Sequence, residues 1–352
     1  MHLFVCAKQV RTNMLQEFVF IIGGLLVIAY ASDKVVRILN GISLLFRVPK
    51  FVLAFLILGL GTSLPDMIVA GVSASQGQMQ MVLGMVIGSN IIVLTIMLGI
   101  VALIKGDFRV RERTVLENFG WIFFVLMIPL FLLVDGRLSY IDGMLLIVVY
   151  LMYAYTIYTQ EKEVWHGKDS GVQLELELSE TPLQPAFYRQ KQILSTEFLK
   201  LLVFLGVLIL TAEFVVQNAE IFSLEAGIPP ILLGFSLIAL GVTLPQLAIE
   251  ITALRANEEE VIWGDIIGGF ITELTLVLGV AALFTGSGVI IELSQVFVGY
   301  AFMFISFILV FFFTFTKKRL TKAEGIALLF LYLIFLTVQF DFLLLGGKSV
   351  IG

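Results

Sequence analysis

The stretch GTSLPD, which ends at Asp66, places a proline, two hydroxyls and a carboxylate in an otherwise apolar segment. Pro65 cannot donate a hydrogen bond to the carbonyl of Gly61, and its ring pushes that carbonyl aside. We therefore expect a local break in the helix and a free carbonyl, which costs on the order of several kcal/mol if left unsatisfied in hydrocarbon. A dehydrated cation can satisfy it, and Thr62 and Ser63 add hydroxyl oxygens beside it. Hard oxygen donors with a carboxylate suit Ca²⁺ or Na⁺.

A second copy of this pattern, GVTLPQ, ends at Gln246 and predicts a second set of oxygen donors. It supplies the carbonyl of Gly241, the hydroxyl of Thr243 and the amide of Gln246. Val242 stands where the first copy has a hydroxyl, and Gln246 stands where it has an acid. We expect both copies to contribute to one cation site, with fewer strong ligands from the second.

Each copy is followed by an apolar segment that contains two glycines four residues apart, a spacing that favours close packing of helices. The pairs are Gly84 with Gly88, and Gly264 with Gly268. Asp265 follows directly after the first glycine of the second pair. Because an acid inside a membrane is energetically expensive and usually functional, we predict that Asp265 is a ligand of the cation.

Two further acids lie close to these motifs and are candidate accessory ligands. Glu250 follows Gln246 by four residues, so both lie on the same helix face. Glu273 lies two turns beyond Asp265. Each could replace charge that the second copy lacks, or could instead form an interhelical hydrogen bond or line a vestibule.

The elements that position these residues are membrane spans. The chain has 352 residues, of which 59% are hydrophobic and 14% charged, whereas a soluble domain carries about 25% charged residues. A span needs roughly 20 mainly apolar residues, and all spans must be helical because an open sheet cannot satisfy its backbone in lipid. We predict an all-α polytopic membrane protein with ten spans, at residues 17–36, 49–75, 79–104, 117–134, 139–159, 197–219, 228–254, 260–285, 293–315 and 324–345.

The chain also repeats itself at an offset of 180 residues. At this offset Leu64-Pro65 matches Leu244-Pro245, and Gly84 matches Gly264. After a slip of two residues, Asp142-Gly143 matches Glu324-Gly325. Five spans in each repeat force the second repeat into the membrane upside down, an arrangement typical of secondary transporters. We predict a first five-helix repeat at 1–160, a linker loop at 161–196 and an inverted five-helix repeat at 197–352.

Basic residues predict the orientation. If both termini lie outside, eighteen of the 22 Lys and Arg residues fall on the inner side, which agrees with the positive-inside rule. We expect an integral protein of the plasma (inner) membrane whose loop 161–196 is cytoplasmic. That loop is either a solvated linker or a regulatory, cation-sensing segment, although it has no EF-hand pattern. The single cysteine, Cys6, excludes an intrachain disulfide.

These motifs resemble the paired signatures of the calcium/cation antiporter superfamily, the family of sodium/calcium exchangers. GTSLPD with GMVIGSNI at 84–91 is similar to the first signature, and GVTLPQ with GDIIGGFI at 264–271 to a more divergent second one. The resemblance implies a ten-span, two-repeat fold. Some branches of the family accept an Asp in place of the usual Glu at the first acid. The implied ion-site positions of this chain are Thr62, Ser63, Asp66 and Met85, and Val242, Thr243, Gln246 and Asp265.

Four of these implied positions depart from the family pattern. Asp66 is a shorter acid, Gln246 is neutral, and Met85 and Val242 offer no hard oxygen. In addition, Ser89-Asn90 of the first signature is replaced by Gly269-Phe270 in the second. We therefore expect a thinned and lopsided site.

The leading interpretation is a secondary antiporter that exchanges Ca²⁺, or a similar cation, for Na⁺ or H⁺ by alternating access. Alternatives are the same fold with a different cation or coupling, and a non-transporting membrane sensor or scaffold. We do not expect an enzyme, because both histidines, His2 and His166, lie outside apolar segments and no H-E-x-x-H signature occurs. We expect no cofactor and no nucleic-acid partner; the partners would be small cations and the lipid bilayer.

Overall fold

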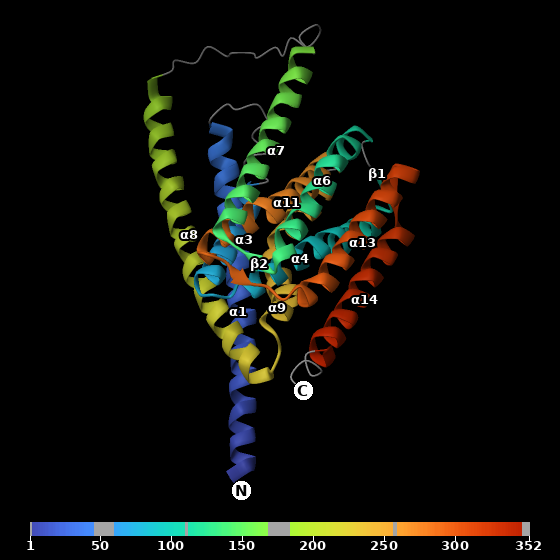
Figure 1. The fold of residues 1–352 in the computed structure, drawn as a ribbon. Coiled ribbons are helices and arrows are strands. Elements are labelled where there is room, and N and C mark those ends of the chain that lie inside the picture. Colours follow the sequence, from blue (N-terminus) through green and yellow to red (C-terminus); the bar gives the residue numbers. More distant parts are fainter. Residues whose placement is uncertain (1, 46–59, 110–111, 168–183, 256–258, 347–352) are drawn as a thin grey trace.

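The structure is a computed structural model that describes residues 2–45, 60–109, 112–167, 184–255 and 259–346 (Figure 1). It is helical apart from four short strands. The helices are α1 (His2–Leu45), α3 (Leu60–Ser75), α4 (Met79–Ile92), α5 (Leu98–Lys105), α6 (Glu112–Leu132), α7 (Tyr140–Gly167), α8 (Gln184–Ala226), α9 (Pro230–Leu233), α10 (Ala239–Arg255), α11 (Glu259–Thr272), α12 (Leu278–Ala282), α13 (Leu293–Lys317) and α14 (Lys322–Gly346). The strands are β1 (Asp107–Arg109), β2 (Arg137–Leu138), β3 (Val289–Ile290) and β4 (Arg319–Thr321).

Three π-helical turns join some of these helices into longer rods. They are η2 (Val93–Met97) between α4 and α5, η4 (Gly234–Ile238) between α9 and α10, and η5 (Glu273–Val277) between α11 and α12. Two 3₁₀ turns, η3 (Leu133–Asp135) and η6 (Leu283–Thr285), end α6 and α12. A π-helical turn carries an extra residue and often marks a functional site. Here η2 and η5 begin at residues 93 and 273, which are separated by the repeat offset.

Eight helices of the described residues are long and apolar enough to span a membrane. They are Met14–Ile38, Met79–Lys105, Tyr140–Ile157, Thr196–Ala226, Pro230–Arg255, Ile262–Thr285, Leu293–Thr316 and Lys322–Phe342. They correspond to eight of the ten predicted spans and confirm the all-helical membrane class. Of the other two, span 49–75 lies partly outside the described residues and continues as α3, and span 117–134 corresponds to the shorter apolar helix Gly120–Asp135.

The predicted break at the two proline motifs is wrong. α3 runs through Pro65, and α10 runs through Pro245, without leaving the helical conformation. A proline removes one backbone hydrogen bond, and the neighbouring helices of a membrane bundle can tolerate that loss. The irregularity in the second copy lies upstream instead, at the π-helical turn that begins at Gly234.

The core is built around two central rods. In the rods Met79–Lys105 and Ile262–Thr285, 78% and 83% of the residues in the most apolar stretch are buried. The peripheral helices α1, α7, α8, α13 and α14 instead present many exposed apolar side chains, such as Leu210, Leu224 and Phe330, as expected for a surface in contact with lipid. The start of α1 and the end of α14 lie at one end of the bundle (Figure 1). The end of α7 and the start of α8 lie at the opposite end.

The same close contact between two glycines occurs twice. A Cβ added at Gly99 would lie 3.0 Å from the carbonyl oxygen of Gly325, and a Cβ added at Gly143 would lie 2.7 Å from that of Gly279. Gly99 and Gly279 are one repeat offset apart, and Gly143 and Gly325 are matched after the two-residue slip. In each case a helix of the first half packs on a helix of the second.

Two small antiparallel ribbons also pair the halves. β1 pairs with β4, with Arg109 opposite Arg319, and β2 pairs with β3, with Arg137 opposite Ile290. The helices after β2 and β4 begin with the same type of N-terminal cap. Ser139 donates backbone and hydroxyl hydrogen bonds to Asp142, and Thr321 donates the same two bonds to Glu324.

Candidate cation site

Four acidic side chains are buried in the interior of the bundle. Asp66 of α3, Glu250 of α10, Asp265 of α11 and Glu273 of η5 are each no more than 5% exposed. These helices pack against one another, since α3 contacts both α10 and α11 as well as η5. Removing a carboxylate from water is expensive unless something compensates its charge, so the neighbours of these four acids decide what the site can do.

Asp265 connects the two proline motifs. The hydroxyl of Thr62 donates a hydrogen bond to Asp265 Oδ1 at 3.3 Å, and the Gln246 side chain also interacts with this carboxylate. The Asp66 carboxylate is close enough to interact electrostatically with Asp265 and Glu273. Residues from α3, α10 and α11 that are about 180 residues apart in the chain therefore meet at one place.

Glu273 is held by two side chains of α4. The hydroxyl of Ser89 donates a hydrogen bond to Glu273, and Asn90 Nδ2 donates another to the same Oε2 atom at 2.9 Å. Glu273 was predicted only as an accessory ligand, and Ser89 and Asn90 were not predicted as ligands at all. The signal in the sequence was an acid inside an apolar segment, which is rarely placed there without a function.

Several oxygens of the cluster have no hydrogen-bond donor among the described residues. They are Asp66 Oδ1, Asp265 Oδ2, Asn90 Oδ1 and both carboxylate oxygens of Glu250. A buried acceptor without a donor carries a desolvation cost of about 1–3 kcal/mol, and more when it is charged. A bound cation removes this cost, because it takes the place of the missing donors.

The other predicted ligands have different surroundings. Ser63 is buried. The Thr243 hydroxyl donates to the carbonyl oxygens of Ala239 and Leu240, at 2.9 and 3.1 Å, within its own helix, which leaves its oxygen lone pairs available to a ligand. Gly241 packs directly against the side chain of Leu25 on α1.

The family model of the sodium/calcium exchanger protein matches residues 17–159 and 196–340. The two matched segments contain all the acids of the cluster. The chain belongs to the sodium/calcium exchanger family.

Relatives within the sodium/calcium exchanger family agree with this. Inner membrane protein YrbG of Escherichia coli (strain K12) is 30% identical over 77% of this chain and 81% of its own length. Sodium/calcium exchanger MaX1 of Methanosarcina acetivorans is 26% identical over 92% and 98%. A solved structure of the sodium-calcium exchanger NCX_Mj is 25% identical, covers 90% of this chain and 96% of its own, and superimposes with a TM-score of 0.56. The protein is therefore an integral membrane protein of this family.

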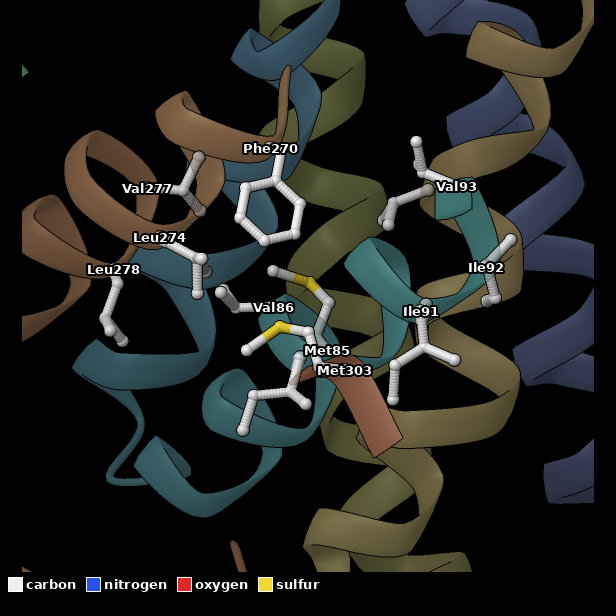
Figure 2. Close-up of a cluster of buried hydrophobic side chains, with 14 of the residues drawn as sticks. Met85, Val86, Ile91, Ile92, Val93, Phe270, Leu274, Val277, Leu278 and Met303 are labelled. Atoms are coloured by element: carbon white, nitrogen blue, oxygen red, sulfur yellow. The ribbon is translucent and has the colours of Figure 1, made fainter. Parts of the chain in front are cut away.

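In this member of the exchanger family, the site is lopsided. The position of the first half that matches Asp265 is Met85, which is buried in an apolar cluster with Met303 and Phe270 (Figure 2). The position that matches Glu273 is Val93, which is also buried. Three of the four buried acids thus come from the second half, and the first half contributes one carboxylate with hydroxyl and amide groups.

The spacing of the acids limits how an exchanger-family site could coordinate an ion here. Within the described residues, no three Asp, Glu, His or Cys side chains are grouped so that they could hold one metal ion. A cation in this site would therefore be bound by carboxylates in ones and twos, and its remaining ligands would be hydroxyl, amide and carbonyl oxygens such as those of Thr62, Ser89 and Asn90.

Proposed function

We propose that the protein is a secondary cation antiporter that exchanges Ca²⁺, or a similar cation, for Na⁺ or H⁺ by alternating access. The observation that carries this proposal is the convergence of Asp66, Asp265 and Glu273 inside the membrane-spanning bundle, with carboxylate and amide oxygens that have no hydrogen-bond donor among the described residues. Hard oxygens of this kind are the ligands of Ca²⁺ and Na⁺. We assign the cation ligands to Asp66, Asp265, Gln246, Thr62 and Ser63, with Glu273 as an accessory ligand, and we assign no more than two of these carboxylates to any one ion.

The weaker candidates complete this assignment. Thr243 can contribute a hydroxyl oxygen, and the carbonyls of Gly61 and Gly241 precede the two prolines by four residues, so neither receives a hydrogen bond from the residue four positions on. The names of the relatives give independent support, because MaX1 and NCX_Mj are both described as sodium/calcium exchangers. The activity is transport of small cations rather than enzymatic catalysis.

The proposed architecture is two inverted repeats of five spans each, at 1–160 and 197–352, joined by the linker 161–196. Two features support it. The glycine contacts and the ribbons each occur twice between the halves, in matching positions, and each half has its own copy of the same helix cap. In such transporters the site lies between the repeats, near the middle of the membrane. We place both termini outside and the linker in the cytoplasm, on the basis of the basic residues.

Flux in proteoliposomes tests this function. The purified protein is reconstituted, and uptake of ⁴⁵Ca²⁺ is measured against outward gradients of Na⁺, K⁺ or H⁺ imposed one at a time. We expect uptake that depends on one of these gradients and exceeds that of protein-free liposomes and of an Asp66→Asn variant. Equal uptake under all gradients and in all three preparations would reject the antiporter.

A further inference from the structure

Glu250 is the most isolated acid of the interior. It is 1% exposed, and neither of its carboxylate oxygens accepts a hydrogen bond from a described residue. The three described ion pairs of the chain involve other residues: Arg37 with Asp33, Lys105 with Glu259 and Lys200 with Glu197. A fully buried carboxylate in this condition needs a cation or a proton to be stable.

The surroundings of Glu250 are part of the cluster but lie to one side of it. Its carboxylate interacts electrostatically with that of Asp265, and the two helices that carry these acids, α10 and α11, pack against each other. Glu250 lies five residues before the end of α10, and Asp265 lies six residues after the start of the adjacent α11. The two acids are therefore at similar depth, one turn closer to the α10–α11 connection than Gln246, whose amide nitrogen lies beside Gly269.

The comparison of the two halves shows what Glu250 adds. Its counterpart in the first half is Ala70, which is fully buried. Conversely, the acid of the first motif, Asp66, has the neutral Gln246 as its counterpart. The second half thus carries its acid one helical turn further along the same helix face, where it interacts with Asp265.

We infer that Glu250 and Asp265, with the amide oxygen of Gln246, bind one Na⁺ ion beside the proposed Ca²⁺ position around Asp66, and that Glu250 belongs to the Na⁺ position alone. This inference rests on the proposed antiporter function. Glu250 adds a single negative charge to the cluster, and one monovalent ion neutralises it. Two carboxylates and one amide provide too few oxygens for Ca²⁺, which takes about six to eight. Asp265 and Gln246 belong to both positions, so the occupancy of one position is coupled to that of the other.

The experiment is a ²²Na⁺ binding titration on the purified full-length protein in detergent, with ⁴⁵Ca²⁺ binding measured on the same preparations. We expect Glu250→Gln to bind one Na⁺ fewer per protein than the wild type, with its Ca²⁺ affinity changed by less than about threefold. Asp265→Asn should lose both the one Na⁺ ion and the Ca²⁺ binding. The matched control is Glu292→Gln, because Glu292 is the residue before α13, outside the cluster, and it should bind as the wild type does.

A charge-transfer variant sharpens the test. Gln246→Glu combined with Glu250→Gln moves the acid back by one turn and should restore the lost Na⁺ ion. If Glu250→Gln does not give a monodisperse protein, Glu250→Asp keeps the charge and should keep the stoichiometry. An unchanged Na⁺ stoichiometry in Glu250→Gln would overturn the inference even if Ca²⁺ flux is present. Absence of flux in the wild type, with loss of one Na⁺ in Glu250→Gln, would instead reject the antiporter and retain the Na⁺ site.

Discussion

The hydroxyl of Thr62 donates a hydrogen bond to the carboxylate of Asp265 across 3.3 Å, although the two residues are 203 positions apart in the chain. This contact brings the hydroxyl of the first proline motif to the acid of the second half. A substitution of either residue therefore alters the ligand set of both halves, and the proposed site is best tested at this junction.

The acids at this junction should be essential for transport. Asp66→Asn and Asp265→Asn each remove a charge that would face the cation, and we expect each to lower Ca²⁺ flux in proteoliposomes by at least about tenfold, equivalent to about 1.4 kcal/mol. Glu292→Gln is the control and should transport at close to the wild-type rate. Normal transport by Asp66→Asn would show that the site is wrongly assigned.

The hydrogen bond from Ser89 to Glu273 should matter for cation affinity. Ser89→Ala leaves Asn90 as the remaining donor to Glu273 among the described residues, and losing a hydrogen bond to a charged group costs about 1.5–3 kcal/mol. We expect the concentration of Ca²⁺ that gives half-maximal uptake to change by about tenfold or more.

Ser73→Ala is the control for this change. Ser73 is equally buried, but its hydroxyl donates to the carbonyl oxygen of Val69 in its own helix. If both serine variants shift the half-maximal concentration by the same amount, the effect of Ser89 is general packing rather than its bond to Glu273.

The two predicted glycine pairs differ in the structure and should differ in stability. A Cβ at Gly84 would overlap the carbonyl oxygen of Ile231, and the backbone of Gly234 is adjacent, whereas nothing lies within 4 Å of a Cβ at Gly264. Overpacking of this kind costs about 1–3 kcal/mol. We expect Gly84→Ala to lower the thermal unfolding temperature in detergent and Gly264→Ala to leave it nearly unchanged. Equal unfolding temperatures would contradict the close approach of α4 to α9.

The orientation can be tested with single cysteines in a Cys6→Ser background. We expect cysteines at Arg109 and Lys318 to face the cytoplasm and one at Ser287 to face outside. Because Arg109 pairs with Arg319, the residue after Lys318, the first two positions share one end of the molecule. An impermeant thiol reagent on intact cells should label only position 287, and labelling of position 109 without permeabilisation would reverse the proposed topology.

Local features could be predicted well from the sequence. The sequence repeat aligned Asp142 with Glu324, and in the structure both acids cap the helix on which they lie. Helix capping depends on residues three positions apart, so a repeat offset is enough to find it. The apolar runs likewise predicted the helices, because a membrane admits few other structures.

Long-range features could not be predicted in the same way. The contact of Ser89 with Glu273 depends on the packing of α4 against η5 and on the π-helical turn that begins at Glu273. No local pattern in the sequence specifies that turn. The break at Pro65 was predicted from the missing backbone hydrogen bond alone, yet the helix continues because the surrounding bundle supports it.

The ribbons that join the halves have a consequence for biosynthesis. β1 pairs with β4, whose residues lie about 200 positions later in the chain. At roughly 5–20 residues per second, the ribosome needs roughly 10–40 s to make that partner. During this interval the second half is not yet available to the newly inserted first half. Asp66 then lacks the acids that adjoin it in the folded protein, and Gly99 lacks its contact with Gly325, so both can meet only lipid, translocon or chaperones. Assembly of the transporter is thus a late event, and the nascent half is the form most exposed to quality control.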